Sequence, residues 1–238
     1  MSREPIFNVP ATVLWTLALL AAVQVIRLLL PDEQNHYITL AMAFIPARYA
    51  GAASELPGGD VASVTSFVTY MLVHGDLSHL IINCAWLLAF GGALARRIGG
   101  LRFLAFSTFC GIAAIAFYLV FHFGAFVPVV GASGAVSGLM AAALRFFMPA
   151  IRSGGLGDLR SRPGQVPLAS IPEMLRDPQI LAVIGIWIAL NFLFGLGGST
   201  LANGASIAWE AHLGGFLVGL FTFSLFDRRQ DSSTQVLH

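Results

Sequence analysis

The sequence predicts an all-α polytopic membrane protein, a bundle whose chain crosses the bilayer six times. Hydrophobic residues make up 57% of the 238 residues and charged residues only 11%, and the mean hydropathy is +0.79. An ordinary soluble domain carries roughly 25% charged residues. Six apolar runs come close to the about 20 residues that a helix needs to span the hydrocarbon core. These runs cover residues 9–30, 77–95, 103–123, 127–147, 180–196 and 205–226.

The first apolar run is similar in position to a secretory signal peptide. It is longer than the apolar region of such a peptide, carries Arg27 near its far end and has no convincing small-residue cleavage site. We therefore expect a membrane helix over residues 9–30.

The placement of arginine predicts the orientation in the membrane. The chain has no lysine, so all 13 cationic side chains are arginines. If the N-terminus lies in the cytoplasm, only Arg27 and Arg48 fall outside, as the positive-inside rule requires. Both termini are then cytoplasmic, and we expect the membrane to be the inner membrane of a bacterial cell. The arginines on the cytoplasmic side are Arg3, Arg96, Arg97, Arg102, Arg145, Arg152, Arg160, Arg162, Arg176, Arg228 and Arg229.

Two connections between the spans are long. Residues 31–72 lie outside in this topology and mix charged residues with apolar pieces, so we expect them to rest partly in the membrane interface. Residues 149–178 are rich in Gly, Pro and Arg and are typical of a flexible cytoplasmic loop. Neither connection is large or apolar enough for a second core. We expect a single membrane domain over residues 1–238.

Polar residues near the ends of three spans are candidates for function, because a polar side chain in hydrocarbon is costly and needs a partner. Spans two, four and six all run from outside to inside, so their first residues share the outer leaflet. His79 and Asn83 begin span two. Ser133 lies about six residues into span four, and His212 lies at a similar depth in span six. The topology therefore brings these four residues to one depth, just below the outer surface.

These residue types suit nucleophilic catalysis. A serine hydroxyl becomes a good nucleophile when a neutral imidazole takes its proton, and Ser133 and His212 can form such a pair. The tetrahedral intermediate then needs donors for its oxyanion. His79 and Asn83 are four residues apart, so they project from one face of a helix and can supply these donors together with the Ser133 N–H.

Glycines follow both members of the expected pair. Gly134 and Gly138 lie in span four, and Gly215 and Gly219 lie in span six. This small-xxx-small spacing lets membrane helices pack with their backbones in near contact. We expect the two spans to pack closely beside the site.

Taken together, these motifs make the sequence similar to the rhomboid family of intramembrane serine proteases. The matching strings are His79-Leu80-Ile81-Ile82-Asn83, like HxxxN; Gly131-Ala132-Ser133-Gly134, like GxSG; and Ala211-His212 with Gly215 and Gly219, like AHxxGxxxG. The resemblance covers the whole chain. It implies a six-helix rhomboid-like bundle in the lipid bilayer that cleaves transmembrane segments of single-span or multi-span proteins near the outer leaflet. In it Ser133 is the nucleophile, His212 the base, and His79 and Asn83 the oxyanion donors.

The chain departs from this family at one position, and several polar residues have plainer interpretations. Ser137 stands where rhomboids carry Tyr or Phe, whose ring packs on the catalytic histidine; we expect Ser137 to bond its own backbone.

His74 matches a family histidine, and we interpret it as structural. Glu210 precedes His212 by two residues and points about 200° around the helix, so we expect a dyad without a third member. We assign Cys84 and Cys110 to packing, and His36 and His122 to solvated positions.

Two alternatives belong to other functional classes. An inactive rhomboid-like protein would bind membrane helices without cutting them, although loss of Ser133 or His212 would mark that class and both are present. A small transporter would carry carboxylates at mid-membrane, whereas the acidic residues here lie in loops or near span ends.

The sequence has no CxxC or HExxH string, so we expect no metal and no other cofactor. A net charge of +1 without a basic stripe predicts no nucleic-acid partner.

Overall fold

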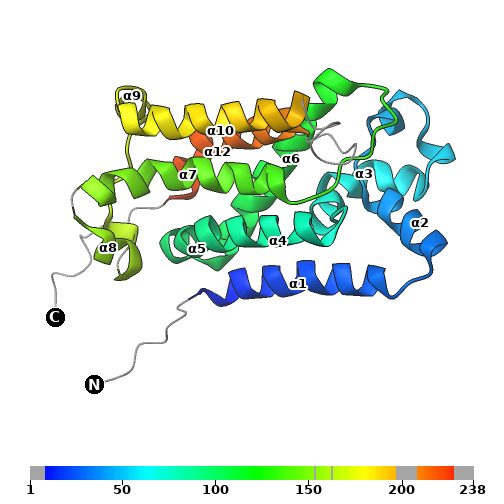
Figure 1. Ribbon diagram of the computed structural model, residues 1–238, viewed down its shortest axis with the longest axis horizontal. Coiled ribbons are helices and arrows are strands. Elements are labelled where there is room, and N and C mark those ends of the chain that lie inside the picture. The colour runs from blue at the N-terminus through cyan, green and yellow to red at the C-terminus, as the bar shows by residue number, and fades with distance from the viewer. Residues whose placement is uncertain (1–8, 153, 162, 197–207, 228–238) are drawn as a thin grey trace.

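The computed structural model of the chain describes residues 9–152, 154–161, 163–196 and 208–227. Within these ranges the backbone is almost entirely helical (Figure 1). Six of the described helical segments are long and apolar enough to cross a membrane, which confirms the expected number. They are α1 (Ala11–Leu28), the segment Leu77–Ile98, α6 (Gly100–His122), α7 (Ser133–Arg152), α10 (Pro178–Leu196) and α12 (Trp209–Phe226).

The second membrane segment is built from three pieces that follow one another without a break: α4 (Leu77–Trp86), a π-helical turn (Leu87–Gly91) and α5 (Gly92–Ile98). Shorter helices fill the connections. They are α2 (Asp32–Met42), α3 (Gly59–Thr69), α8 (Leu156–Ser161) and α9 (Ile171–Leu175), with 3₁₀ turns at Pro46–Ala50, Ala53–Glu55, Tyr70–Leu72 and Pro163–Gln165.

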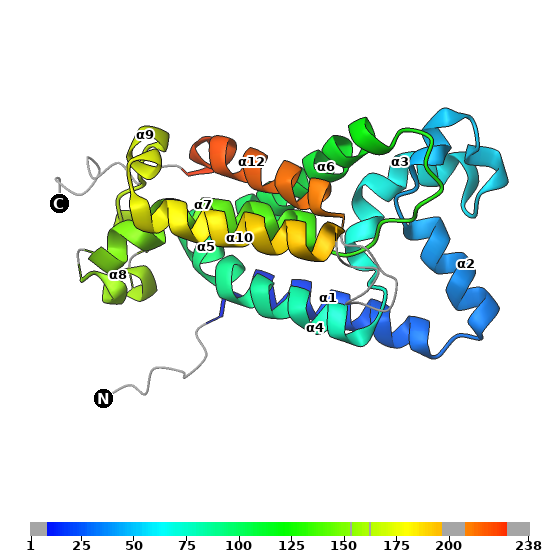
Figure 2. The ribbon, with the colours of Figure 1, turned by 45° about the horizontal axis from the view of Figure 1, so that its top comes forward.

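Helix α7 lies at the centre of the bundle. Of its membrane-length window 78% is buried, compared with 6% for α10. It packs mainly against α12 and α6, and the three helices lie side by side in both ribbon views (Figures 1 and 2). A residue at the first turn of α7 therefore meets side chains from several neighbouring helices.

Glycines bring α7 and α12 into backbone contact. A Cβ added to Gly138 would lie 2.9 Å from the carbonyl oxygen of Gly215. A Cβ added to Gly215 would overlap the carbonyl oxygen of Gly134, and one added to Gly219 would overlap that of Gly138. Such an approach is open only to residues without a side chain. It aligns the first turns of the two helices beside each other.

The fourth span begins six residues later than the sequence predicts. Residues 127–132 are apolar and were expected to be helical, but Val129 exchanges two backbone hydrogen bonds with Phe44, at 2.8 and 3.0 Å. Gly131 adopts a left-handed φ of +110°, which a helix does not contain. Ser133 is therefore the first residue of α7 rather than a residue deep inside it.

The bounds of the first, second, third and fifth spans differ from the expected bounds by three residues or fewer. The fourth span ends five residues later than expected, at Arg152, and α12 begins at Trp209, four residues after the expected start of the sixth span. Residues 205–207, the first of the sixth expected span, lie outside the described residues. So do four of the arginines used to predict the orientation: Arg3, Arg162, Arg228 and Arg229.

Helix α1 begins, and helix α12 ends, at the same end of the bundle (Figure 1). Thr12, at the start of α1, lies against Gly100 at the start of α6. Arg97, near the end of α5, forms an ion pair at 2.8 Å with Asp227, which follows α12. The opposite end carries α2 and α3 (Figure 2).

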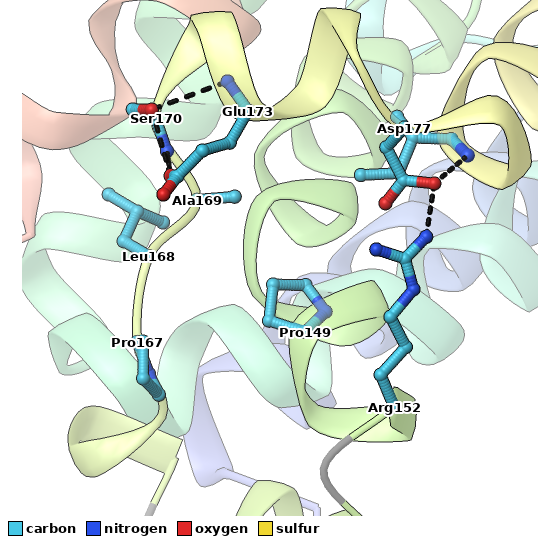
Figure 3. A pocket seen from close by; sticks show the side chains of 9 residues that line it. Pro149, Arg152, Pro167, Leu168, Ala169, Ser170, Glu173 and Asp177 are labelled. Atoms are coloured by element: carbon cyan, nitrogen blue, oxygen red, sulfur yellow. Dashed lines mark hydrogen bonds and ion pairs between the residues drawn. The ribbon is translucent and has the colours of Figure 1, made fainter.

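Residues 149–178 contain regular structure where a flexible loop was expected. They include the end of α7 together with α8 and α9, and they line a pocket of about 830 Å³. Arg152 and Asp177 form an ion pair beside this pocket, and Ser170 caps α9 by accepting the Glu173 N–H (Figure 3). The pocket lies at the opposite end of α7 from Ser133, so it is remote from the candidate catalytic residues.

Candidate active site

Ser133 and His212 are hydrogen-bonded to each other. The distance from Ser133 Oγ to His212 Nε2 is 2.7 Å. Ser133 is the first residue of α7 and His212 the fourth of α12, and the glycine contact between these helices sets the two side chains face to face. An imidazole nitrogen at this distance is within reach to accept the hydroxyl proton.

A third residue, Asn191 of α10, holds the other side of the imidazole. His212 Nδ1 lies 2.6 Å from Asn191 Oδ1, and Asn191 Nδ2 donates to the carbonyl oxygen of Trp187 at 2.8 Å. Sequence reasoning missed this residue and expected only a dyad. The available signal was an amide inside an otherwise apolar span, since such a group needs a partner in the membrane.

The first turn of α7 presents backbone N–H groups beside the Ser133 hydroxyl. The first N–H groups of a helix have no carbonyl partner within it. In α7 the N–H of Val136 donates back to Ala132, at 3.0 Å. The N–H of Ser133 lies before this first hydrogen bond of the helix. Because α7 begins at Ser133, this N–H is available to bind an anion.

His79 and Asn83 lie on one face of α4, next to Gly131. A Cβ added to Gly131 would lie 2.6 Å from His79 Nε2 and 3.8 Å from Asn83 Nδ2. One hydrogen of the Asn83 amide donates to the His79 carbonyl oxygen at 3.0 Å, which leaves the second for another acceptor. Because Gly131 precedes Ser133 by two residues, the structure brings all four candidate residues together.

Asp76 caps the start of α4 and thereby places His79. Its Oδ1 accepts the His79 N–H at 2.8 Å and the Ser78 hydroxyl at 2.5 Å. The Ser78 hydroxyl and then the His79 N–H lower the pKa of this carboxyl, because both donate to its charged form. The cap fixes the turn of the helix that carries His79.

His74 packs against His79, and Arg27 binds the backbone of His74. The ring of His74 is fully buried and meets the His79 ring edge-on, with ring centroids 5.1 Å apart. Burial lowers the pKa of His74 to about 4, so this ring is neutral at neutral pH. Arg27 Nη1 donates to the His74 carbonyl oxygen at 2.7 Å. Arg27 is a buried charge at the end of a span, and the sequence analysis used it only for orientation.

Ser137 donates its hydroxyl to the Ser133 carbonyl oxygen at 2.8 Å, the backbone bond expected for it. Among the described residues no aromatic ring stacks on His212. The two cysteines are free thiols. Cys110 is fully buried against Gly138, which agrees with a packing role.

Glu210 and His122 form a pair at the start of α12. His122 Nε2 lies 3.0 Å from Glu210 Oε1, and the His122 ring stacks on Tyr118 at 4.1 Å. His122 is partly solvated, with 32% of its side chain exposed, although the sequence analysis did not foresee its pairing with Glu210. His36 is exposed, as expected. Glu210 is held by His122 and takes no part in the bond between Ser133 and His212.

Comparison with known proteins identifies the family. A sequence model of the rhomboid domain matches residues 61–229, which is most of the chain and includes every candidate site residue. No curated protein sequence matches the chain. Rhomboid proteins are generally intramembrane serine proteases that act on membrane proteins within the bilayer. With its six membrane-length helices, the chain is an integral multi-pass membrane protein that belongs to the rhomboid family.

Proposed function

We propose that this protein is a serine endopeptidase that cleaves transmembrane segments of other membrane proteins. The observation that carries the proposal is the 2.7 Å hydrogen bond from Ser133 Oγ to His212 Nε2 inside a membrane bundle. A transporter has no need of a serine and a histidine in this geometry, whereas a serine nucleophile for acyl transfer needs an adjacent base such as His212.

The reaction begins when Ser133 Oγ attacks the carbonyl carbon of the scissile peptide bond. His212 Nε2 accepts the hydroxyl proton as the new C–O bond forms. The tetrahedral intermediate collapses, the C–N bond breaks, and the imidazolium gives its proton to the leaving amine. Water then attacks the acyl-enzyme ester while His212 again acts as base, which releases the second product and restores Ser133.

The oxyanion of each tetrahedral intermediate needs hydrogen-bond donors that are already in place. The Ser133 N–H, the imidazole of His79 and the free hydrogen of the Asn83 amide surround the backbone at Gly131 and can supply them. Donors of this kind contribute roughly 2.7 to 4 kcal/mol each in other enzymes. Gly131 leaves the space into which these groups point.

The arginine distribution supports an orientation with the site near the outer leaflet. Ser133, His212 and His79 lie in the first turns of α7, α12 and α4. These three helices begin toward the end of the bundle that carries α2 and α3 (Figure 2). Arg96, Arg97 and Arg152 lie toward the other end, at the ends of α5 and α7. By the positive-inside rule that end is cytoplasmic. A substrate would then be cut just below the outer surface, in the inner membrane of a bacterium.

The test is labelling of the purified protein by a fluorescent fluorophosphonate, followed by incubation with a panel of single-span membrane proteins and mass analysis of the products. We expect Ser133→Ala and His212→Ala to abolish both labelling and cleavage. Ser137→Ala is the matched control, since it removes a hydroxyl one turn further along α7, and it should leave labelling intact. Activity should fall on acidification, because the base must be neutral and a free imidazole titrates near pH 6.5.

Two outcomes would overturn the proposal. Labelling or cleavage that persists in Ser133→Ala would exclude Ser133 as the nucleophile. Stable capture of single-span proteins without labelling or products, in the unmodified protein, would identify an inactive member of the family that binds helices.

A further inference from the structure

Asn191 is a polar side chain within the apolar helix α10, and it contacts the candidate catalytic residue His212. Its Oδ1 lies 2.6 Å from His212 Nδ1, on the side of the ring opposite Ser133. We propose that Asn191 is a positioning residue that holds His212 in the orientation and tautomer required by Ser133, an inference that rests on the function proposed above.

The hydrogen bonds of Asn191 determine which nitrogen of the His212 ring carries the hydrogen. Asn191 Nδ2 donates to the carbonyl oxygen of Trp187, which can only accept. The amide oxygen must therefore face His212, so Nδ1 carries the hydrogen and donates it to Oδ1. With its hydrogen on Nδ1, the neutral ring presents a bare Nε2 to the Ser133 hydroxyl. This is the tautomer that a general base needs.

No other described side chain performs this task. Ser137 is small and its hydroxyl is bonded to the Ser133 carbonyl oxygen. Glu210, the nearest carboxylate along α12, is paired with His122. His79 on α4 is the other titratable side chain near the site, but the two nitrogens of the His212 ring have Ser133 and Asn191 as their partners. The Asn191 amide is therefore the group that fixes the ring.

The packing of α10 on α12 explains how a residue from a sparsely buried helix can do this. Trp187 stacks on Phe216 of α12, with ring centroids 4.6 Å apart and planes at 22°. Trp187 also supplies the carbonyl oxygen that orients the Asn191 amide. One residue thus docks α10 beside His212 and directs the amide toward it.

An amide is chemically suited to this position. During attack His212 becomes an imidazolium, and the amide oxygen stabilises the charged ring through the Nδ1–H bond. An amide cannot take the proton away, and it places no net charge in the hydrocarbon. A carboxylate in the same place would be costly to bury.

The experiment measures the rate of fluorophosphonate labelling of Ser133 as a function of probe concentration and pH, which separates the maximal rate from the probe affinity. Asn191→Leu removes the acceptor with little change of volume. We expect its maximal labelling rate to fall roughly 10- to 100-fold with unchanged probe affinity, because the lost bond stabilises a charge that forms only during attack. Ile186→Ala, an exposed position on the same helix, is the matched control and should behave as the unmodified protein.

Asn191→Asp tests the same role in the opposite direction. It restores an acceptor, so we expect the rate to return to within about tenfold of normal. A carboxylate also favours the imidazolium, so the acidic limb of the rate should move to higher pH in Asn191→Asp and to lower pH in Asn191→Leu. A residue that only stabilised the fold would not shift the two limbs in opposite directions. Thermal unfolding of each variant in the same detergent verifies that the protein is folded.

The outcomes separate this inference from the proposed function. If Ser133→Ala abolishes labelling but Asn191→Leu labels at the normal rate and pH, the positioning role is wrong and the serine peptidase stands. Equal losses in Asn191→Leu and Asn191→Asp, with unmoved acidic limbs, also overturn the positioning role. If Ser133→Ala still labels, the proposed function itself fails.

Discussion

The imidazole of His79 lies directly over the backbone of Gly131. A Cβ at residue 131 would come within 2.6 Å of His79 Nε2, closer than real Cβ atoms come to other groups. Gly131 also has a φ of +110°, which L side chains rarely adopt, and its N–H donates to the Tyr70 carbonyl oxygen at 2.9 Å. Two independent constraints therefore require glycine two residues before Ser133, the proposed nucleophile.

Gly131→Ala should displace His79 from the position where we propose that it binds the oxyanion. We expect the rate of fluorophosphonate labelling to fall by roughly tenfold or more, because at least one donor is lost. Gly124→Ala is the control, since Gly124 has a φ of +78° but its added Cβ would meet only Ala50, at 3.5 Å. It carries a similar backbone strain away from the site and should label normally. Equal labelling of both variants would show that His79 is not placed by Gly131.

Gly219→Ala should separate α12 from α7. The new Cβ would overlap the Gly138 carbonyl oxygen, and the helices must move apart to admit it. We expect the free energy of unfolding to fall by about 1 to 3 kcal/mol. Gly185→Ala on α10 meets open space and should leave stability unchanged or raise it by up to about 1 kcal/mol. Thermal or denaturant unfolding in one detergent compares the two, and equal stability would contradict the close packing.

Acid should destabilise the fold in part through His74. Its pKa is about 4 when folded and about 6.5 when unfolded, so between these values the unfolded chain binds more protons. The free energy of unfolding contributed by His74 therefore falls as the pH drops from 6.5 toward 4. Between pH 7 and pH 4.5 the unmodified protein should lose about 2 to 3 kcal/mol more than His74→Phe. Identical pH dependence of unfolding in both proteins would rule out this contribution.

Removal of the α4 cap should affect both stability and the site. Asp76→Ala leaves the His79 N–H without its acceptor, so we expect a loss of about 1 kcal/mol of stability and slower labelling of Ser133. Asp76→Asn keeps a good capping oxygen and should retain most of both. If Asp76→Ala labels as fast as Asp76→Asn, the cap does not position His79.

Much of the architecture could be predicted from the sequence because hydrocarbon imposes simple rules. Apolar runs of about 20 residues revealed the six spans. Parallel orientation of the second, fourth and sixth spans placed Ser133, His212, His79 and Asn83 at the same depth without any tertiary information. The structure brings these residues together, while their chemical roles stay predictions for the labelling experiments.

The errors arose where hydropathy carries no information about backbone conformation or partners. Residues 127–132 are as apolar as a helix, but pairing of Val129 with Phe44 and the left-handed φ of Gly131 keep them extended. Asn191 went unnoticed because its partner, His212, is 21 residues away in another helix. The amide within an apolar span was visible in the sequence, but its pairing with His212 could be identified only from the packing of α10 on α12.

Helix α10, which carries Asn191, is the least buried of the described membrane helices. Only 6% of its membrane-length window is fully buried, and residues such as Leu181, Ile186 and Leu193 are exposed. In a membrane, acyl chains or detergent tails would contact these exposed side chains. Since Asn191 lies on α10, we expect bilayer thickness and acyl-chain order to affect the orientation of the His212 ring, and through it the reactivity of Ser133, while α7, with 78% of its window buried, is better shielded from the lipid.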